Sequence, residues 1–140
     1  MAEAANNAEL KAAFAAHLQE TQDHVKRIEQ IFSSLDDTPG GENCKGMKGL
    51  IEEGDEIIKR RGKAEIKDAA LIAAAQRVEH YEIAGYGVAR TFAQQLGYTE
   101  AADLLQQTLD EEGEADKKLT SIAEGHMLKA GINEGAMQTA

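Results

Sequence analysis

Histidine and acidic residues interrupt the apolar stripes of three predicted helices. In the first of these helices, His17 and Glu20 lie three residues apart, beside Phe14 and Thr21. Burying an isolated carboxylate costs several kcal/mol, so acids on a buried helix face must be paired, protonated or bound to a cation. Spacings of three or four residues place two side chains on one helix face, where they can point at the same centre. The candidate metal ligands selected in this way are His17, Glu20, Glu79, Glu82, Glu112 and Asp116.

The chemistry of this set favours a pair of hard divalent cations. Arg27, Arg77 and Arg90 are the neighbouring arginines, and they are too few to neutralise all of the inward-facing acids. Carboxylate and imidazole donors without a thiolate suit iron, with manganese as the alternative. The sequence therefore predicts a dinuclear metal site, with iron as the expected metal.

The competing interpretation is an ordinary solvated helix face, where most single glutamates of a long helix lie. It stays open for His17, Glu82 and Asp116, and His24 and His80 are the weaker candidates beside them. Tyr86 is assigned to the core. Five acids are assigned to solvated helix faces: Asp23, Glu29, Glu111, Glu114 and Glu124.

No catalytic residue and no organic cofactor is predicted. Cys44 has no identifiable histidine partner that would make it a nucleophile, and it is interpreted as a free thiol. The nearby glycines 46, 49 and 54 match neither a phosphate-binding loop nor a dinucleotide fingerprint. The sequence leaves open whether the protein is an enzyme.

Four helical segments must position these residues, and no strand of useful length is predicted. Apolar residues recur at spacings of three and four in residues 8–35, 66–96 and 99–124, which predicts three long amphipathic helices. Asn6 or Asn7 is expected to cap the first, Gly97 to end the second and Thr99 to cap the third. Residues 44–61 form a weaker, glycine-containing pattern that predicts a short crossing helix.

These elements predict an all-α bundle over residues 1–125, followed by a flexible tail over residues 126–140 that lacks periodicity. On the first helix, the expected buried stripe is Phe14, Leu18, Thr21, Val25, Ile28, Phe32 and Leu35. Three long helices form a poorly closed core. We therefore expect a further helix, supplied either by a partner chain or by a segment that precedes Met1.

The composition excludes several functional classes. The 140 residues include 15 Lys and Arg against 25 Asp and Glu, for a formal net charge of −10. Such a polyanion repels phosphate backbones, so no nucleic-acid partner is expected. The apolar runs fall far short of the roughly 20 residues that span a bilayer, and no signal peptide is evident. The lone Cys44 suits a reducing compartment, so a soluble, cytoplasmic domain is expected.

Three segments carry a resemblance to a known family. Residues 17–21 (HLQET), 68–82 (DAALIAAAQRVEHYE) and 104–112 (LLQQTLDEE) resemble the YciF/DUF892 family of ferritin-like proteins. The resemblance extends over residues 8–124. It implies a ferritin-like bundle with a dinuclear site, with iron as the expected metal. It also implies a homodimer and a bacterial protein that takes part in the response to stress. The activity of the family is poorly defined, so the resemblance specifies the fold better than the reaction.

The resemblance implies, position by position, that the family's inward-facing acids correspond to Glu20, Glu79, Glu82 and Glu112. It also implies that His17 corresponds to the family's histidine. The chain departs from the family at its beginning, because residues 1–10 resemble only the end of a further glutamate-bearing helix. Ferritin-like di-iron sites use Glu-x-x-His pairs on two of four helices. The nearest equivalents here are the 20/23 and 79/82 pairs of acids, which places full two-metal occupancy in doubt.

Two functions follow from this sequence. The first is a ferritin-like di-metal carboxylate protein that binds iron and reacts with dioxygen or peroxide. The alternative is a metal-free helical module that homodimerises through its exposed apolar groove, with the acids solvated or paired with arginines across the interface. Iron storage as a mineral is the weakest option, since no cage-forming surface is evident.

Overall fold

A computed structural model describes residues 1–41, 43–126 and 129–139. Most of these residues are helical, which confirms the predicted all-α helical bundle. The three long helices and the short one lie close to their predicted positions. The elements in chain order are η1 (Ala2–Ala4), α1 (Ala8–Ser34), α2 (Lys45–Lys59), α3 (Ala64–Gln95), α4 (Thr99–Glu124), β1 (Gly125–His126), β2 (Lys129–Ala130) and α5 (Ile132–Thr139).

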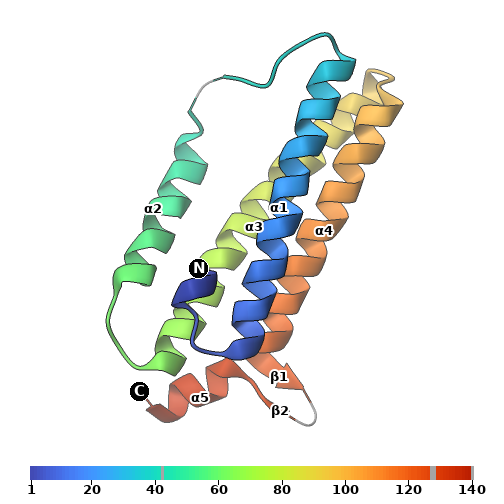
Figure 1. Ribbon diagram of the computed structural model, residues 1–140. Helices are drawn as coiled ribbons and strands as arrows, with labels where there is room; N and C mark the ends of the chain where they lie inside the picture. The colour runs from blue at the N-terminus through green and yellow to red at the C-terminus, as the bar shows by residue number, and fades with distance from the viewer. Residues whose placement is uncertain (42, 127–128, 140) are drawn as a thin grey trace.

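The helix α4 connects α1 to α3, because it packs against both of them. Figure 1 shows α1, α3 and α4 running alongside one another, with α2 displaced to one side, where it packs against α3. The two short strands and α5 lie at the end of the bundle where α1 begins and α4 ends. Within the described part of the chain, no helix is long and apolar enough to cross a membrane.

The helix ends follow the predicted local signals with one exception. The Asn7 side chain accepts hydrogen bonds from the backbone N–H groups of Glu9 and Leu10 and caps α1 as predicted. Gly97 follows α3 with a φ of 81°, a left-handed conformation that glycine adopts readily. Thr99 was the predicted cap of α4, but Tyr98 holds the N-cap position and Thr99 is already helical. The short turn between α3 and α4 makes the helix restart one residue earlier than the threonine signal implies.

The core consists of two apolar clusters, one toward each end of the bundle. The first includes Leu10, Leu71 and Leu119, and the second includes Ile31 and Leu105. Along each of the three long helices, the candidate ligand positions fall between the residues of these two clusters. The fold therefore places the polar candidates in a layer with apolar packing on either side.

The apolar stripe predicted for α1 is only partly buried. Leu18, Val25 and Leu35 are 58%, 55% and 42% exposed. The buried positions of α1 are instead Leu10, His24 and Ile31. The reason is that α1 packs mainly on α4, so only one side of the helix is covered and part of the apolar stripe lies on the other side.

The segment after residue 125 differs from the predicted frayed tail. β1 pairs antiparallel with β2, and α5 packs against α3 and α4. Ile132 is 9% exposed and belongs to the same apolar cluster as Leu71 and Leu119. An eight-residue helix with a single buried apolar residue carries too short a periodic pattern to be detected in the sequence. Positions 127, 128 and 140 of the predicted tail lie outside the described residues.

Asp68 fixes the start of α1 to α3. Its side chain is buried, and Oδ2 accepts a hydrogen bond from the backbone N–H of Asn7 at 2.7 Å. Its Oδ1 accepts from the backbone N–H and the side-chain amide of Asn6 at 2.8 and 3.2 Å. This single carboxylate thus holds the turn from which α1 begins.

Replacing Asp68 by alanine should therefore weaken the whole bundle. The Asp68→Ala variant leaves backbone N–H groups without their acceptor, and we expect the free energy of unfolding to fall by about 2–4 kcal/mol. Urea denaturation measures the change, with Asp55→Ala at an exposed position of α2 as the matched control. A loss no greater than that of the control would show that Asp68 does not anchor α1.

Candidate metal centre

Three side chains from three helices meet in the polar layer of the bundle. They are His17 from α1, Glu79 from α3 and Glu112 from α4, and one ligand atom of each lies within 4.8 Å of the others. Glu79 and Glu112 are 3% and 0% exposed, while His17 is half-buried. Of the described residues, these three form the group of histidine and acidic side chains that could hold a metal ion.

The two ring nitrogens of His17 have different partners. Nε2 points inward, 3.1 Å from Oε2 of Glu79 and 3.4 Å from Oε2 of Glu112. Nδ1 lies 3.0 Å from Oε2 of Glu20, whose side chain is 47% exposed. Metal-binding histidines commonly donate their second N–H to a carboxylate, which fixes the tautomer and the ring orientation. Glu20 is therefore placed to orient His17.

A second histidine connects Glu112 to the surface. Nδ1 of the buried His24 lies 3.0 Å from Oε1 of Glu112, and its Nε2 lies 2.9 Å from Oε2 of Glu111. Arg27 donates to both carboxylate oxygens of Glu111, at 2.6 and 2.8 Å, and to the hydroxyl of Thr108 at 3.1 Å. A continuous chain of side chains from Arg27 to Glu112 thus holds the buried carboxylate in place.

These contacts shift the proton affinities of the group. Close contact with the Glu79 carboxylate raises the pKa of His17 to about 9, although burial opposes the shift. Burial raises the pKa of Glu79, and contact with Glu112 adds to this effect. Burial alone would also raise the pKa of Glu112, but its contacts with His24 and Glu79 and the nearby His17 lower it. Of the two acids, Glu112 therefore loses its proton more readily than Glu79.

Glu82 extends the acidic group by one helical turn of α3. Burial raises the pKa of Glu82 to about 7, and the negative charges of Glu112 and Glu79 act in the same direction. Burial also raises the pKa of Tyr86 to about 12, helped by the charge of Glu82. The ring of Tyr86 lies edge-on to that of His24, with the ring centroids 6.3 Å apart.

Several buried atoms of this centre lack a hydrogen-bond partner. They are Oε2 of Glu79, both carboxylate oxygens of Glu112 and Nδ1 of His24. The histidine contacts above bring these atoms within ion-pair distance but not into hydrogen-bond geometry. A buried acceptor without a donor costs about 1–3 kcal/mol. Oxygen and imidazole lone pairs that converge in this way fit a hard divalent cation such as Fe²⁺ or Mn²⁺.

The structure separates the six predicted ligands into three groups. It brings together His17, Glu79 and Glu112, with Glu82 one turn away on α3. Glu20 contacts the outer nitrogen of His17. Asp116 lies apart, accepting a hydrogen bond from Gln76 at 3.0 Å, with Nε2 of His80 at 3.4 Å.

Two residues contribute more to the site than the sequence predicts. Glu111, predicted on the solvated face, links Arg27 to His24. His24, a weaker candidate from the sequence, is 1% exposed and contacts Glu112. The signal available in the sequence was the seven-residue spacing of His17 and His24, which places both imidazoles on one side of the helix.

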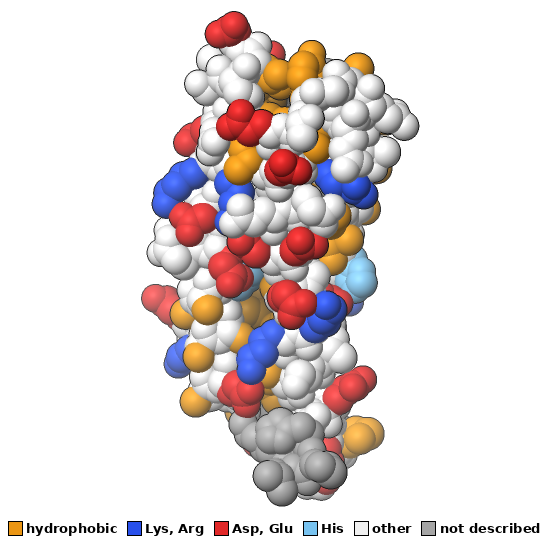
Figure 2. Space-filling model, turned by 90° about the vertical axis from the view of Figure 1, so that its right-hand side faces the viewer, with side chains coloured by type: hydrophobic (Ala, Val, Ile, Leu, Met, Phe, Trp, Pro, Cys, Tyr) orange, Lys and Arg blue, Asp and Glu red, His pale blue; other side chains and the backbone are white. Residues whose placement is uncertain are grey.

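Two grooves reach the centre from different sides, and His17 and Glu79 line both. One lies between α1 and α4 and has a volume of ≈ 720 Å³. The other lies between α1, α2 and α3, has a volume of ≈ 920 Å³, and is also lined by Glu82. Figure 2 shows the face that includes α4, on which acidic side chains gather near mid-height.

The protein is thus a helical bundle with imidazole and carboxylate groups in its interior. Residues 1–134 match the family described as a domain of unknown function, DUF892, and the chain belongs to this family. It is 48% identical to Protein YciF of Escherichia coli strain K12 over 135 residues, which cover 96% of this chain and 81% of that protein.

Solved structures agree with this assignment. The crystal structure of the E. coli stress protein YciF matches with a TM-score of 0.82 and 51% identity, covering 86% of this chain and 76% of that one. YcfI of Rhodopseudomonas palustris, described as a candidate structural protein, matches with a TM-score of 0.83 and 40% identity, covering 87% and 78%. The predicted family resemblance and ferritin-like bundle are confirmed.

The raised pKa of His17 predicts how the stability of the metal-free protein depends on pH. Protonated His17 stabilises the fold fully below its unfolded pKa of 6.5, and this contribution is lost as the pH rises through about 9. Between pH 7.5 and pH 10 we expect the free energy of unfolding to fall by about 2 kcal/mol. Urea denaturation of chelator-treated protein at several pH values measures the change.

The His17→Gln variant should lose this decline, because glutamine does not titrate. His80→Gln is the matched control, since His80 is 67% exposed, and it should keep the decline of the natural protein. Equal slopes for His17→Gln and the natural protein would show that His17 is not the titrating group.

Proposed function

We propose that this protein is a ferritin-like metal-binding carboxylate protein, with iron as the metal and a dinuclear site as its full form. The observation that carries the proposal is the set of buried carboxylate oxygens of Glu79 and Glu112 that lack hydrogen-bond donors beside Nε2 of His17. Buried carboxylate oxygens of this kind bind cations strongly, because a cation neutralises their charge. The arrangement of three ligands from three helices supports a site that the fold organises in advance.

Each residue near the centre has a role in this proposal. His17, Glu79 and Glu112 would hold the first metal, and deprotonation of His17 and Glu79 would accompany its binding. Glu82 would contribute to a second metal, and its pKa near 7 lets its carboxylate hold or release a proton close to neutral pH. Glu20 and His24 orient the ligands from outside. Asp116 would need to leave Gln76 to join them.

The chemistry that iron supplies in such a site is the reduction of dioxygen or peroxide. The protein's contribution is to hold the ligands between two apolar clusters, one toward each end of the bundle, so that the centre is reached from the sides of the helices. The description of the E. coli YciF structure as that of a stress protein is consistent with a reaction of this kind.

Metal analysis tests the proposal directly. The natural protein, purified without a chelating tag and incubated with Fe²⁺ without oxygen, should retain iron after desalting. Glu79→Gln and Glu112→Gln keep the side-chain volume but remove the charge, and we expect each to retain at least about tenfold less iron. Glu124→Gln, at an exposed position of α4, is the control. Unchanged iron in both site variants, with helical content preserved, would contradict the proposal.

A second candidate function is a homodimeric structural module. Leu18 on α1 and Ile51 on α2 are 58% and 55% exposed and line the groove between α1, α2 and α3. A second copy of the chain could cover this apolar surface. The description of YcfI as a candidate structural protein favours this alternative.

Sedimentation with and without iron separates the two functions. A dimer that forms without iron, in a protein that retains none, would favour the structural module. In that case we expect Leu18→Lys and Ile51→Lys to weaken the dimer about tenfold or more. Leu96→Lys, at a 70% exposed position near the end of α3, should have little effect. A monomer in both conditions would contradict the structural alternative.

A further inference from the structure

The two grooves that reach the centre differ in charge. Among the described residues that line it, the groove between α1 and α4 has five acids outside the metal centre and one lysine, Lys118. The groove between α1, α2 and α3 has apolar walls that include Leu18, Met47, Ile51 and Val78. Apart from the site residues, its charged side chains are Glu3 and Lys67, which carry opposite signs. The acids of the first groove are Glu9, Glu20, Asp110, Glu111 and Glu114.

The acidic groove is also lined by a residue that carries an unsatisfied buried ligand atom. Glu79 lines it together with His17, is 3% exposed, and has a carboxylate oxygen without a hydrogen-bond partner. Small side chains border the groove on both helices, including Ala12 and Ala16 of α1 and Ala115 of α4. A solvated cation at this mouth would thus meet exposed acids first and the buried carboxylate afterwards.

Electrostatics favours this groove over the apolar one. A cleft lined by one sign of charge concentrates ions of the opposite sign and raises association rates by roughly 10 to 10³-fold. A hydrated divalent cation gains nothing comparable from the apolar walls around Leu18 and Ile51, where loss of hydration is uncompensated. We therefore expect the association rate of a divalent cation to be higher through the acidic groove than through the apolar one.

We propose that divalent cations enter the centre through the groove between α1 and α4, drawn by the acids at its mouth. This inference rests on the proposed function, because it concerns the same metal centre. It assigns a role to Asp110 and Glu114, which belong to the groove but not to the ligand group. Their function is to steer the cation, not to bind it in its final position.

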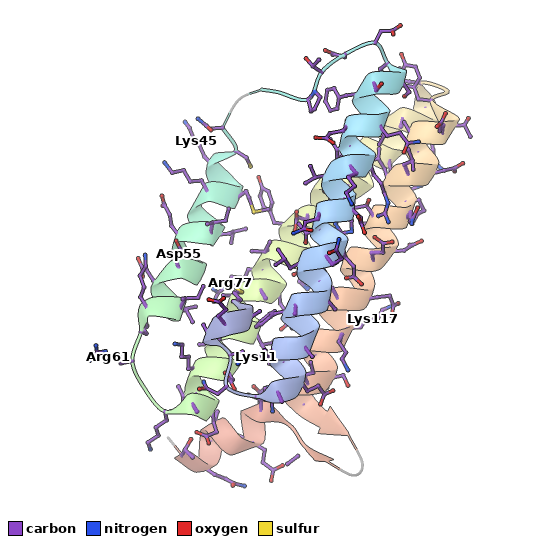
Figure 3. The ribbon with its side chains drawn as sticks, in the orientation of Figure 1. Lys11, Lys45, Asp55, Arg61, Arg77 and Lys117 are labelled. Atoms are coloured by element: carbon purple, nitrogen blue, oxygen red, sulfur yellow. The ribbon has the colours of Figure 1, made fainter. Side chains whose placement is uncertain are left out.

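Asp110 and Glu114 are the best positions for a test because the other three acids of the groove contact Arg27, Lys118 or the candidate ligand His17. Arg27 pairs with Glu111, Lys118 pairs with Glu9, and His17 contacts Glu20. Asp110 accepts a hydrogen bond from the neutral Gln106. Glu114 pairs with Lys117 at 2.7 Å, but both side chains are more than 70% exposed, and Figure 3 shows Lys117 pointing outward from α4.

The test is the rate at which Co²⁺ binds to the metal-free full chain, followed by stopped-flow absorption. In low salt, we expect the double variant Asp110→Asn/Glu114→Gln to bind about three- to tenfold more slowly than the natural protein. At 1 M salt, where the Debye length is about 3 Å, the two rates should converge. The amount of Co²⁺ bound at saturation should stay the same, because the ligands are intact.

The matched control is Glu3→Gln/Glu52→Gln, which changes the net charge equally. Glu3 lines the apolar groove and Glu52 lies on α2, which borders it. We expect this control to bind at nearly the natural rate. Equal slowing in both double variants would show a general charge effect, and greater slowing in the control would assign entry to the other groove; either result overturns the proposal.

A steric pair of variants provides an independent measurement. Ala16→Phe narrows the acidic groove, and Leu18→Trp enlarges a side chain in the apolar groove, so only the first should slow Co²⁺ binding. Slowing only by Leu18→Trp would overturn the proposed route. A natural protein that binds no Co²⁺ or Fe²⁺ at all would contradict the proposed function, whereas binding at equal rates in all variants would contradict the route alone.

Discussion

The carboxylates of Glu79 and Glu112 lie in the interior of the bundle, where the charged form of an acid is costly unless a cation or a proton accompanies it. The chain meets this constraint with two imidazoles, because His17 contacts both acids and His24 contacts Glu112. Three helices must therefore keep their relative positions for the acids to stay buried. The same arrangement leaves carboxylate oxygens without donors, and this is what makes the centre suited to a metal.

The surroundings of the centre follow from how α4 is packed. Because α4 contacts both α1 and α3, it supplies Glu112 at the middle of the bundle and the Glu111 contact that orients His24. The opposite side of α1 carries exposed apolar residues such as Leu18 and Val25. The centre is thus bordered by an acidic groove on one side and an apolar groove on the other. The first fits the entry of cations and the second fits the contact surface of the structural alternative.

The outer contacts of the two histidines set the orientation of their imidazole rings. Glu20 engages the outer nitrogen of His17, and Arg27 acts through Glu111 on His24. Each imidazole therefore presents its other nitrogen to the buried acids. Membership of the DUF892 family places this arrangement in a group of related helical bundles, among them the E. coli stress protein YciF.

The all-α class, the approximate extent of the four main helices and the helices that carry the acids are predictable from residue order, because periodicity and capping signals are local. His17, Glu79 and Glu112 are candidates on the same grounds. Three features follow instead from the packing of the helices: Glu20 contacts the outer nitrogen of His17, Asp116 lies apart, and α5 packs on the bundle. Periodicity assigns a side chain to one face of its helix, but the rotation of each helix against its neighbours decides which atoms meet.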